Sequence, residues 1–242
     1  MQKTIFLFPL FFLFLSFDLY PQDSRGFKPV TINIGGTLTT LYSGSHALLI
    51  GVSDYDFWPD LPGVEEDLSA VENTLTEHGF QVRIVRKKKK KQLQQAFEDF
   101  INDYGMDVNN RLLFYFAGHG HTLETSYGED MGYIVPADAQ LPAKNLNGFR
   151  KHALSMEQMD VYARNIQSKH ALFMFDACFS GSIFALSRAV PEVISYKTTQ
   201  HVRQFITSGD ADEEVPDKSI FRKQFVDALI TDIADGNNDG FL

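Results

Sequence analysis

Two residues of this sequence combine a reactive side chain with a setting that suits catalysis. His119 lies between two glycines just after the apolar run 111–116, and Cys178 closely follows the apolar run 171–175. A thiol becomes a nucleophile when a nearby imidazole holds or takes its proton, and attack on a carbonyl needs backbone N–H groups to stabilise the oxyanion. Glycine neighbours let the backbone approach a substrate closely. The two residues therefore predict a cysteine nucleophile with a histidine partner.

Each residue also has a simpler interpretation. Cys178 is the only cysteine of the chain, and a lone free cysteine is often an inert core residue. A histidine between glycines at the end of a strand contributes little to packing, so a functional role is favoured for His119. For Cys178 alone the core interpretation would be favoured, and the presence of His119 reverses that preference.

The elements that would position this pair alternate along the chain. Short apolar runs predict strands and a 3.6-residue periodicity predicts helices. The expected strands are residues 47–52, 81–85, 111–116, 132–135, 171–175 and 202–207, and the expected helices are 65–78, 92–103, 155–166 and 221–233. This alternation predicts a three-layer α/β fold, with a mostly parallel six-stranded sheet and helices on both faces. Ligands of open parallel sheets bind beyond the carboxyl ends of the strands. Since His119 and Cys178 both follow strand ends, we expect them to meet at one edge of the sheet.

The segments around the pair resemble the two catalytic motifs of the caspase-like cysteine peptidases. These segments are residues 114–120 (FYFAGHG) and 176–181 (DACFSG), and they are most similar to the metacaspase and orthocaspase branch. Residues 61–67 (LPGVEED) and 206–209 (ITSG) add to the resemblance, which runs from about residue 46 to residue 233.

The resemblance implies a cysteine endopeptidase of caspase-like fold. Cys178 would be the nucleophile and His119 its general acid/base partner, with the backbone amides of Gly120 and Cys178 as the oxyanion hole. The thioacyl-enzyme would then be hydrolysed by water. The alternative is a catalytically inactive interaction module on the same fold, a pseudoprotease. The intact pair favours the enzyme.

The resemblance also implies a substrate preference. Caspases carry glutamine two residues before the nucleophile, whereas this chain carries Asp176, as metacaspases do. Asp67 matches a second pocket aspartate, and Ser208 is a third substrate-binding candidate. Two carboxylates would bind a guanidinium through charge-assisted hydrogen bonds, so we expect peptide or protein substrates cut after Arg or Lys. The alternative is that Asp176 only caps backbone amides at the strand end.

The composition, 44% hydrophobic and 22% charged, is typical of a globular protein. The net charge of −9 argues against nucleic acid as a partner. The local run of six cations at residues 86–91 is more typical of a solvated lead-in to a helix than of an anion-binding or cleavage site. For His121 an exposed loop position is favoured over a place beside the catalytic pair.

The N-terminus predicts export. Lys3 precedes an apolar run at residues 5–17, which is shorter than the ~20 residues of a membrane-spanning helix and is typical of a signal peptide. Pro9 argues against a buried helix. We expect a signal peptide at 1–22, a leader or edge hairpin at 23–45 and the peptidase domain at 46–242. The protein would be periplasmic or extracellular, without a stable membrane span after signal removal.

Two further expectations concern regulation. Residues 235–240 (DGNNDG) imitate the start of an EF-hand calcium loop, but the sequence stops at Leu242, before the glutamate such a loop needs at position 12. This early stop suggests a truncated gene product, and a polar turn is the favoured interpretation. We expect no required cofactor and no metal site, with a Ca²⁺ requirement or a calcium-dependent scaffold left open. The connector 186–197, with Arg188 and Lys197, is a candidate for self-cleavage.

Overall fold

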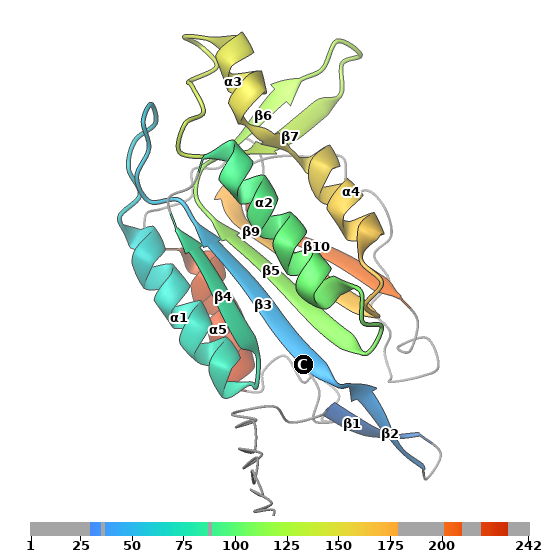
Figure 1. Cartoon of the computed structure of the whole chain (residues 1–242). Helices are drawn as coiled ribbons and strands as arrows, with labels where there is room; N and C mark the ends of the chain where they lie inside the picture. The colour runs from blue at the N-terminus through green and yellow to red at the C-terminus, as the bar shows by residue number, and fades with distance from the viewer. Residues whose placement is uncertain (1–29, 35–36, 87–88, 179–200, 210–218, 232–242) are drawn as a thin grey trace, which may run out of the picture.

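A five-stranded parallel sheet forms the centre of the molecule. The computed structural model describes residues 30–34, 37–86, 89–178, 201–209 and 219–231. The sheet has the strand order β10-β9-β5-β3-β4 (Figure 1). Its strands are β3 (Gly44–Gly51), β4 (Gln81–Arg86), β5 (Asn110–Ala117), β9 (His170–Cys178) and β10 (Val202–Gly209).

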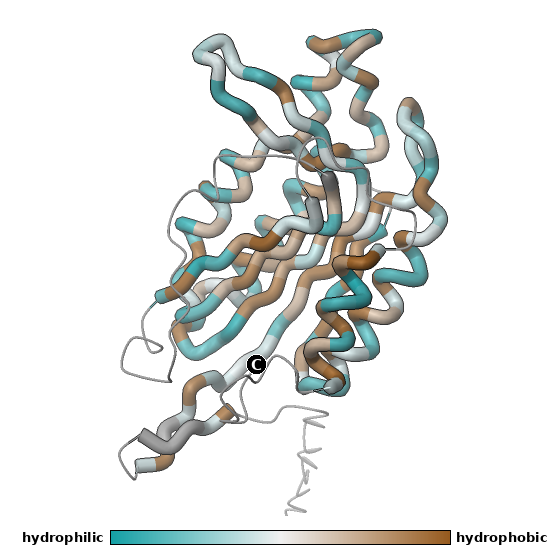
Figure 2. Tube along the Cα trace, turned by 180° about the vertical axis from the view of Figure 1, so that it is seen from behind, coloured by the Kyte–Doolittle hydropathy of each residue, from teal (hydrophilic) through white to brown (hydrophobic). Residues whose placement is uncertain are grey.

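Helices cover both faces of this sheet, as expected for three layers. One face packs against α2 (Lys90–Phe100) and α4 (Met156–Asn165), and the other against α1 (Gly63–Glu77) and α5 (Ile220–Ile230). The reason is visible in β5, where Phe114 and Phe116 lie in the first core and Leu113 and Tyr115 in the second. Successive side chains of a strand point to opposite faces, so an apolar run buries both sides. Figure 2 shows these hydrophobic strands between more polar helices.

The sixth expected strand belongs to a different sheet. Residues 132–135 overlap β7 (Asp130–Ile134), which pairs antiparallel with β6 (Gly120–Glu124) and β8 (Leu154–Ser155). The connection between β6 and β7 is too short for a parallel crossover, which needs a dozen or more residues, so the two form a hairpin. The expectation of six strands in one sheet was therefore wrong for the described residues.

The helices begin and end close to the expected residues. Ser155 caps α4, because its hydroxyl accepts the Gln158 N–H, and α2 continues into a π-helical turn, η1 (Ile101–Gly105). The short α3 (Leu146–His152) was not expected. Ahead of the central sheet, β1 (Val30–Ile34) and β2 (Thr37–Tyr42) form an antiparallel pair.

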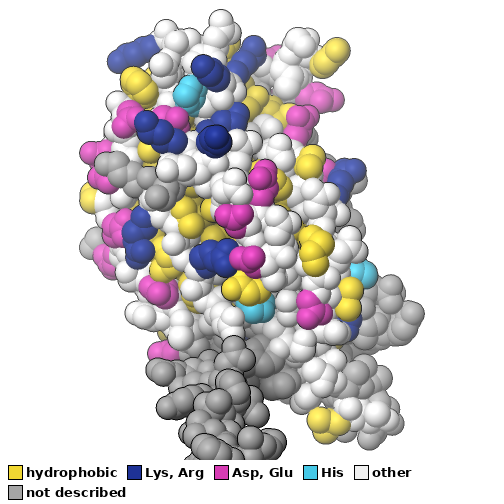
Figure 3. Space-filling model, in the orientation of Figure 1, with side chains coloured by type: hydrophobic (Ala, Val, Ile, Leu, Met, Phe, Trp, Pro, Cys, Tyr) yellow, Lys and Arg dark blue, Asp and Glu magenta, His cyan; other side chains and the backbone are white. Residues whose placement is uncertain are grey.

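The basic run at 86–91 joins two elements. Arg86 ends β4 and its Nε lies 2.9 Å from Oε2 of Glu65, while Lys90 and Lys91 form the start of α2. In Figure 3, Lys and Arg side chains gather towards the end of the molecule that holds α3 and the start of α2.

Several expectations lie outside the described residues: the signal segment, the connector 186–197 and the calcium-loop-like residues 235–240. Within the part of the chain that the structure describes, no helix has the length and apolar character needed to cross a membrane.

Candidate active site

His119 and Cys178 lie at the carboxyl ends of neighbouring strands. In the parallel register of β5 and β9, Ala117 pairs with Asp176, and the Gly118 N–H donates to the Asp176 carbonyl at 3.3 Å. Cys178 is the last residue of β9, and its side chain lies outside what the structure describes. The topology thus brings the backbones of the two residues to one edge of the sheet, which is where ligands of such sheets bind.

The segment after β3 fixes the position of the His119 ring. The His119 N–H donates to the Tyr55 hydroxyl at 2.8 Å, and Nε2 lies 2.8 Å from the Pro59 carbonyl oxygen. The ring packs 4.7 Å from the Tyr55 ring and 5.2 Å from the Trp58 ring, measured between centroids. A β-carbon at Gly118 would lie 2.6 Å from the Tyr55 hydroxyl, so this close approach requires glycine.

The contact with Pro59 also indicates which nitrogen of the neutral imidazole carries the hydrogen. A carbonyl oxygen only accepts, so Nε2 carries the hydrogen and Nδ1 keeps its lone pair. Burial lowers the pKa of His119, and the hydrogen bond to Pro59 offsets this in part. The imidazole is therefore neutral near pH 7, with Nδ1 able to accept a proton.

Asp176 is the centre of a second, polar group of residues. Its carboxylate Oδ2 accepts hydrogen bonds from the Tyr115 hydroxyl, at 2.8 Å, and from the Ser219 hydroxyl. Its other oxygen, Oδ1, is buried without a partner among the described residues, and so is the Ser208 hydroxyl. Burial raises the pKa of Asp176, while Ser219, Tyr115 and Ser208 lower it. Ser208 therefore lies close enough to act on the carboxyl, although the two do not reach hydrogen-bond geometry.

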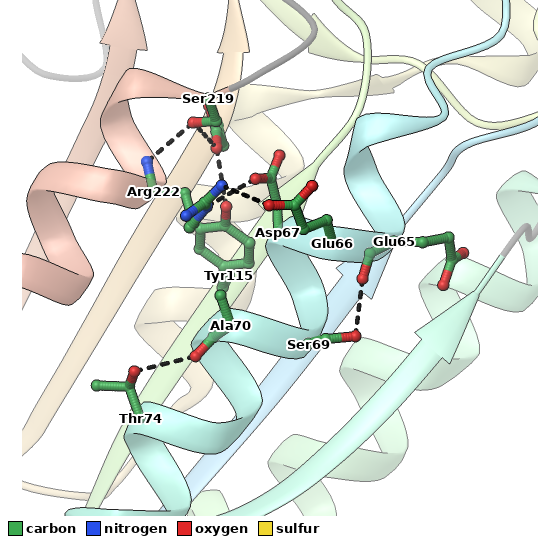
Figure 4. A network of polar contacts seen from close by, with 10 residues as sticks. Glu65, Glu66, Asp67, Ser69, Ala70, Thr74, Tyr115, Ser219 and Arg222 are labelled. Atoms are coloured by element: carbon green, nitrogen blue, oxygen red, sulfur yellow. Dashed lines mark hydrogen bonds and ion pairs between the residues drawn. The ribbon is translucent and has the colours of Figure 1, made fainter.

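Asp67 reaches the same group from α1. Its Oδ1 lies 2.7 Å from Nε of Arg222, and Nη2 of Arg222 lies 3.7 Å from Oε1 of Glu66 (Figure 4). The Asp67 side chain is 6% exposed and that of Arg222 17%. Burial raises the pKa of Asp67, Arg222 lowers it, and the nearby charge of Asp176 raises it further. We call the residues around the two carboxylates the acidic cluster: Asp67, Tyr115, Asp176, Ser208, Ser219 and Arg222.

The structure thus gathers all three expected substrate-binding residues, Asp67, Asp176 and Ser208, in one place. The donors to the Asp176 carboxylate among the described residues are side-chain hydroxyls, so the interpretation of Asp176 as a cap for backbone amides gains no support. Gly120 begins β6 directly after His119, where it pairs with Ile134.

His121 differs from the favoured expectation of an exposed loop position. It lies on β6, half-buried, with its ring 5.7 Å from Trp58 and 5.3 Å from Phe149. Burial lowers its pKa. Because side chains alternate between the two faces of a strand, His121 lies on the face of β6 that contacts Trp58, which also packs against the His119 ring.

Five residues that contact His119, Asp67 or Asp176 lie outside the segments that the resemblance singled out: Tyr55, Trp58, Pro59, Ser219 and Arg222. The aromatic residues in the segment after β3 were the one available signal. Within the described part of the chain, no three His, Cys, Asp or Glu side chains come together in a way that could hold a metal ion.

A comparison with protein-family models identifies the family of this chain. A family model described as a caspase domain, of the C14 peptidases, matches residues 45–232. Among solved structures, the chain is similar to a Geobacter sulfurreducens protein, with 15% identity and a TM-score of 0.45 over 65% of this chain and 60% of that one. No curated protein sequence matches the chain. Because the caspase model spans most of its length, the chain belongs to the caspase domain family of cysteine peptidases.

Proposed function

We propose that this protein is an endopeptidase in which Cys178 is the nucleophile and His119 its acid/base partner. The observation that supports this most is the orientation of the His119 ring at the strand end next to that of Cys178. The Pro59 carbonyl accepts the Nε2–H, so the lone pair of the imidazole is on Nδ1, at the edge of the sheet where Cys178 ends β9. A base oriented by a third group beside a nucleophile is the arrangement that covalent catalysis needs.

The reaction would proceed in two stages. Nδ1 of His119 takes the thiol proton, and the Cys178 thiolate attacks the carbonyl carbon of the substrate. The oxyanion is held by the backbone N–H groups of Gly120 and Cys178, and the imidazolium returns the proton to the leaving amine as the C–N bond breaks. Water, deprotonated by the same imidazole, then attacks the thioester and releases the carboxylic acid and the thiol.

We further propose a preference for Arg or Lys before the scissile bond, as in metacaspases. The support is the unused hydrogen-bonding capacity in the acidic cluster. A buried carboxylate oxygen of Asp176 and the buried Ser208 hydroxyl have no partner among the described residues, and leaving such groups unsatisfied is costly. A basic side chain of the substrate would supply both the missing donor and the opposite charge.

Export, self-cleavage in the connector 186–197 and a calcium requirement remain proposals that rest on the sequence. Unchanged activity under strong chelation would remove the calcium requirement. Identical intact masses of wild type and Cys178→Ala after long incubation would remove self-cleavage.

The direct test of the proposed function is hydrolysis of a mixed peptide library by the purified protein, with Cys178→Ala as the matched control. We expect cleavage after basic residues by the wild type and none by the variant. An inactive wild type would favour the interaction module, and equal cleavage by both proteins would remove Cys178 as the nucleophile.

A further inference from the structure

One cation in the acidic cluster belongs to the chain itself. Arg222 lies in the first turn of α5, and its guanidinium crosses to α1, where Nε lies 2.7 Å from Oδ1 of Asp67 (Figure 4). Its positive charge also lowers the pKa of Asp176, so it lies within electrostatic reach of the second carboxylate. A basic side chain of a substrate would thus enter a cluster that already holds one guanidinium.

The two carboxylates are consequently not equivalent. Asp67 is paired with Arg222, whereas Oδ1 of Asp176 is buried without a partner among the described residues. We propose that Arg222 is a specificity-determining residue, which withholds Asp67 from the substrate and leaves Asp176 as the carboxylate that receives a basic side chain. This inference rests on the proposed function and refines its substrate class.

The start of α5 holds Arg222 in this position. The Ser219 hydroxyl accepts the Arg222 N–H at 2.8 Å and donates its own hydrogen to Asp176. One serine therefore links the helix terminus, with its arginine, to the free carboxylate. The Arg222 side chain is only 17% exposed and that of Asp67 6%, so solvent does little to separate the pair.

A single carboxylate beside a hydroxyl suits the compact ammonium of Lys as well as the guanidinium of Arg. Two carboxylates would favour Arg, because its planar fork can donate to both at once. The wild type should therefore cleave Arg and Lys peptides with similar efficiency, and releasing Asp67 should shift the preference towards Arg.

The first test compares reporter peptides that differ only in Arg, Lys or norleucine before the scissile bond. In Arg222→Gln, the ratio of kcat/KM for the Arg peptide to that for the Lys peptide should rise about tenfold, through one new charge-assisted interaction. The control is Arg83→Gln, which breaks another Arg–Asp pair, with Asp103 at 2.7 Å, on the opposite side of the sheet. It should leave the ratio unchanged. An unchanged or lower ratio in folded Arg222→Gln would overturn the proposal.

A second test uses Asp67→Asn alone and combined with Arg222→Gln; the combined variant removes both charges of the pair, so it avoids the unpaired buried carboxylate that could keep Arg222→Gln alone from folding. Asp67→Asn leaves Arg222 with only the exposed Glu66, at 3.7 Å, as an anionic partner beside Asp176, so cleavage of both basic peptides should fall about tenfold relative to the norleucine peptide. Adding Arg222→Gln removes that charge and should restore most of the loss. If Asp67 contacts the substrate directly, the second substitution restores nothing, and the proposal is wrong.

Cys178→Ala separates this inference from the proposed function. If the wild type hydrolyses the peptides through Cys178 but the ratios do not respond to Arg222, only the inference fails. If no Cys178-dependent hydrolysis occurs, the proposed function fails and the inference fails with it.

Discussion

The two regions of the proposed site differ in the charge they contain: the surroundings of His119 are uncharged, whereas the acidic cluster holds buried charged side chains. The His119 imidazole is surrounded by the rings of Tyr55 and Trp58 and by the Pro59 carbonyl, all from the segment after β3. The acidic cluster instead buries two carboxylates and a guanidinium, drawn from α1, β9 and the start of α5.

From this difference we expect the His119 region to serve proton transfer and the acidic cluster to serve substrate selection. A neutral, oriented imidazole serves proton transfer on any substrate, because its contacts do not depend on the substrate side chain. Buried charges serve discrimination, because an unpaired or like charge is costly there. Changes around His119 should therefore alter the rate for all peptides, and changes in the acidic cluster should alter which peptides are cut.

The largest effect is expected from His119→Ala. Removing one member of a nucleophile–base unit typically costs ~10³-fold or more in kcat, and the loss should be the same for Arg, Lys and norleucine peptides. Steady-state kinetics with circular dichroism as a folding control checks this. A loss confined to basic peptides would break the division between the two regions.

Asp176→Asn should instead change the preference. Loss of one charge-assisted interaction, worth roughly 1.5–3 kcal/mol, should lower cleavage after Arg and Lys by about 10–100-fold and leave the norleucine peptide nearly unaffected. Because burial raises the pKa of this carboxyl, removing its charge should not lower the free energy of unfolding at pH 7. A uniform loss of activity, or marked destabilisation, would contradict the proposed role.

The pH dependence should follow the lowered pKa of His119. Below its ordinary value of 6.5, the unfolded chain binds a proton that the folded imidazole resists. The free energy of unfolding should therefore decrease as the pH falls from that value through the lowered pKa. Chemical denaturation at several pH values measures this, and His119→Gln should lack this part of the dependence. An identical dependence in the variant would exclude His119 as its source.

Tyr55→Phe should have the smallest effect. It removes the acceptor of the His119 N–H and keeps the ring that packs on the imidazole, so it should cost about 1 kcal/mol of stability and reduce kcat several-fold for every peptide. Thermal unfolding and the same peptide panel test this. A changed ratio between Arg and norleucine peptides would show that the two regions are coupled.

Much of the fold could be predicted from the sequence, because strands such as β3 bury both faces and are therefore continuous apolar runs. The assignment of residues 132–135 to the central sheet failed, since a short apolar run does not indicate which strand it pairs with. β7 pairs with the strand that a tight connection makes its neighbour.

The residues of the candidate site that lie in recognisable motifs could be predicted from the sequence. The residues that contact them from distant parts of the chain could not. The segments around His119 and Asp176 have a recognisable sequence. The contact from the Pro59 carbonyl leaves no signal in the sequence, because every residue has a backbone carbonyl that can accept a hydrogen bond. Arg222 contacts Asp67, which lies 155 residues away in the sequence. Helical periodicity predicts which face of a helix is buried, but it does not predict which distant residue a polar side chain contacts.

Covalent labelling tests the central claim most directly, because Cys178 is the only cysteine of the chain. The wild-type protein is treated with peptidyl chloromethyl ketones ending in Arg, Lys or Asp, and the adducts are measured by intact mass and located by peptide mapping. We predict rapid modification of Cys178 by the Arg and Lys reagents, little by the Asp reagent, and a large loss of rate in His119→Ala. Modification at equal rates by all three reagents, or a rate that is independent of His119, would contradict the account.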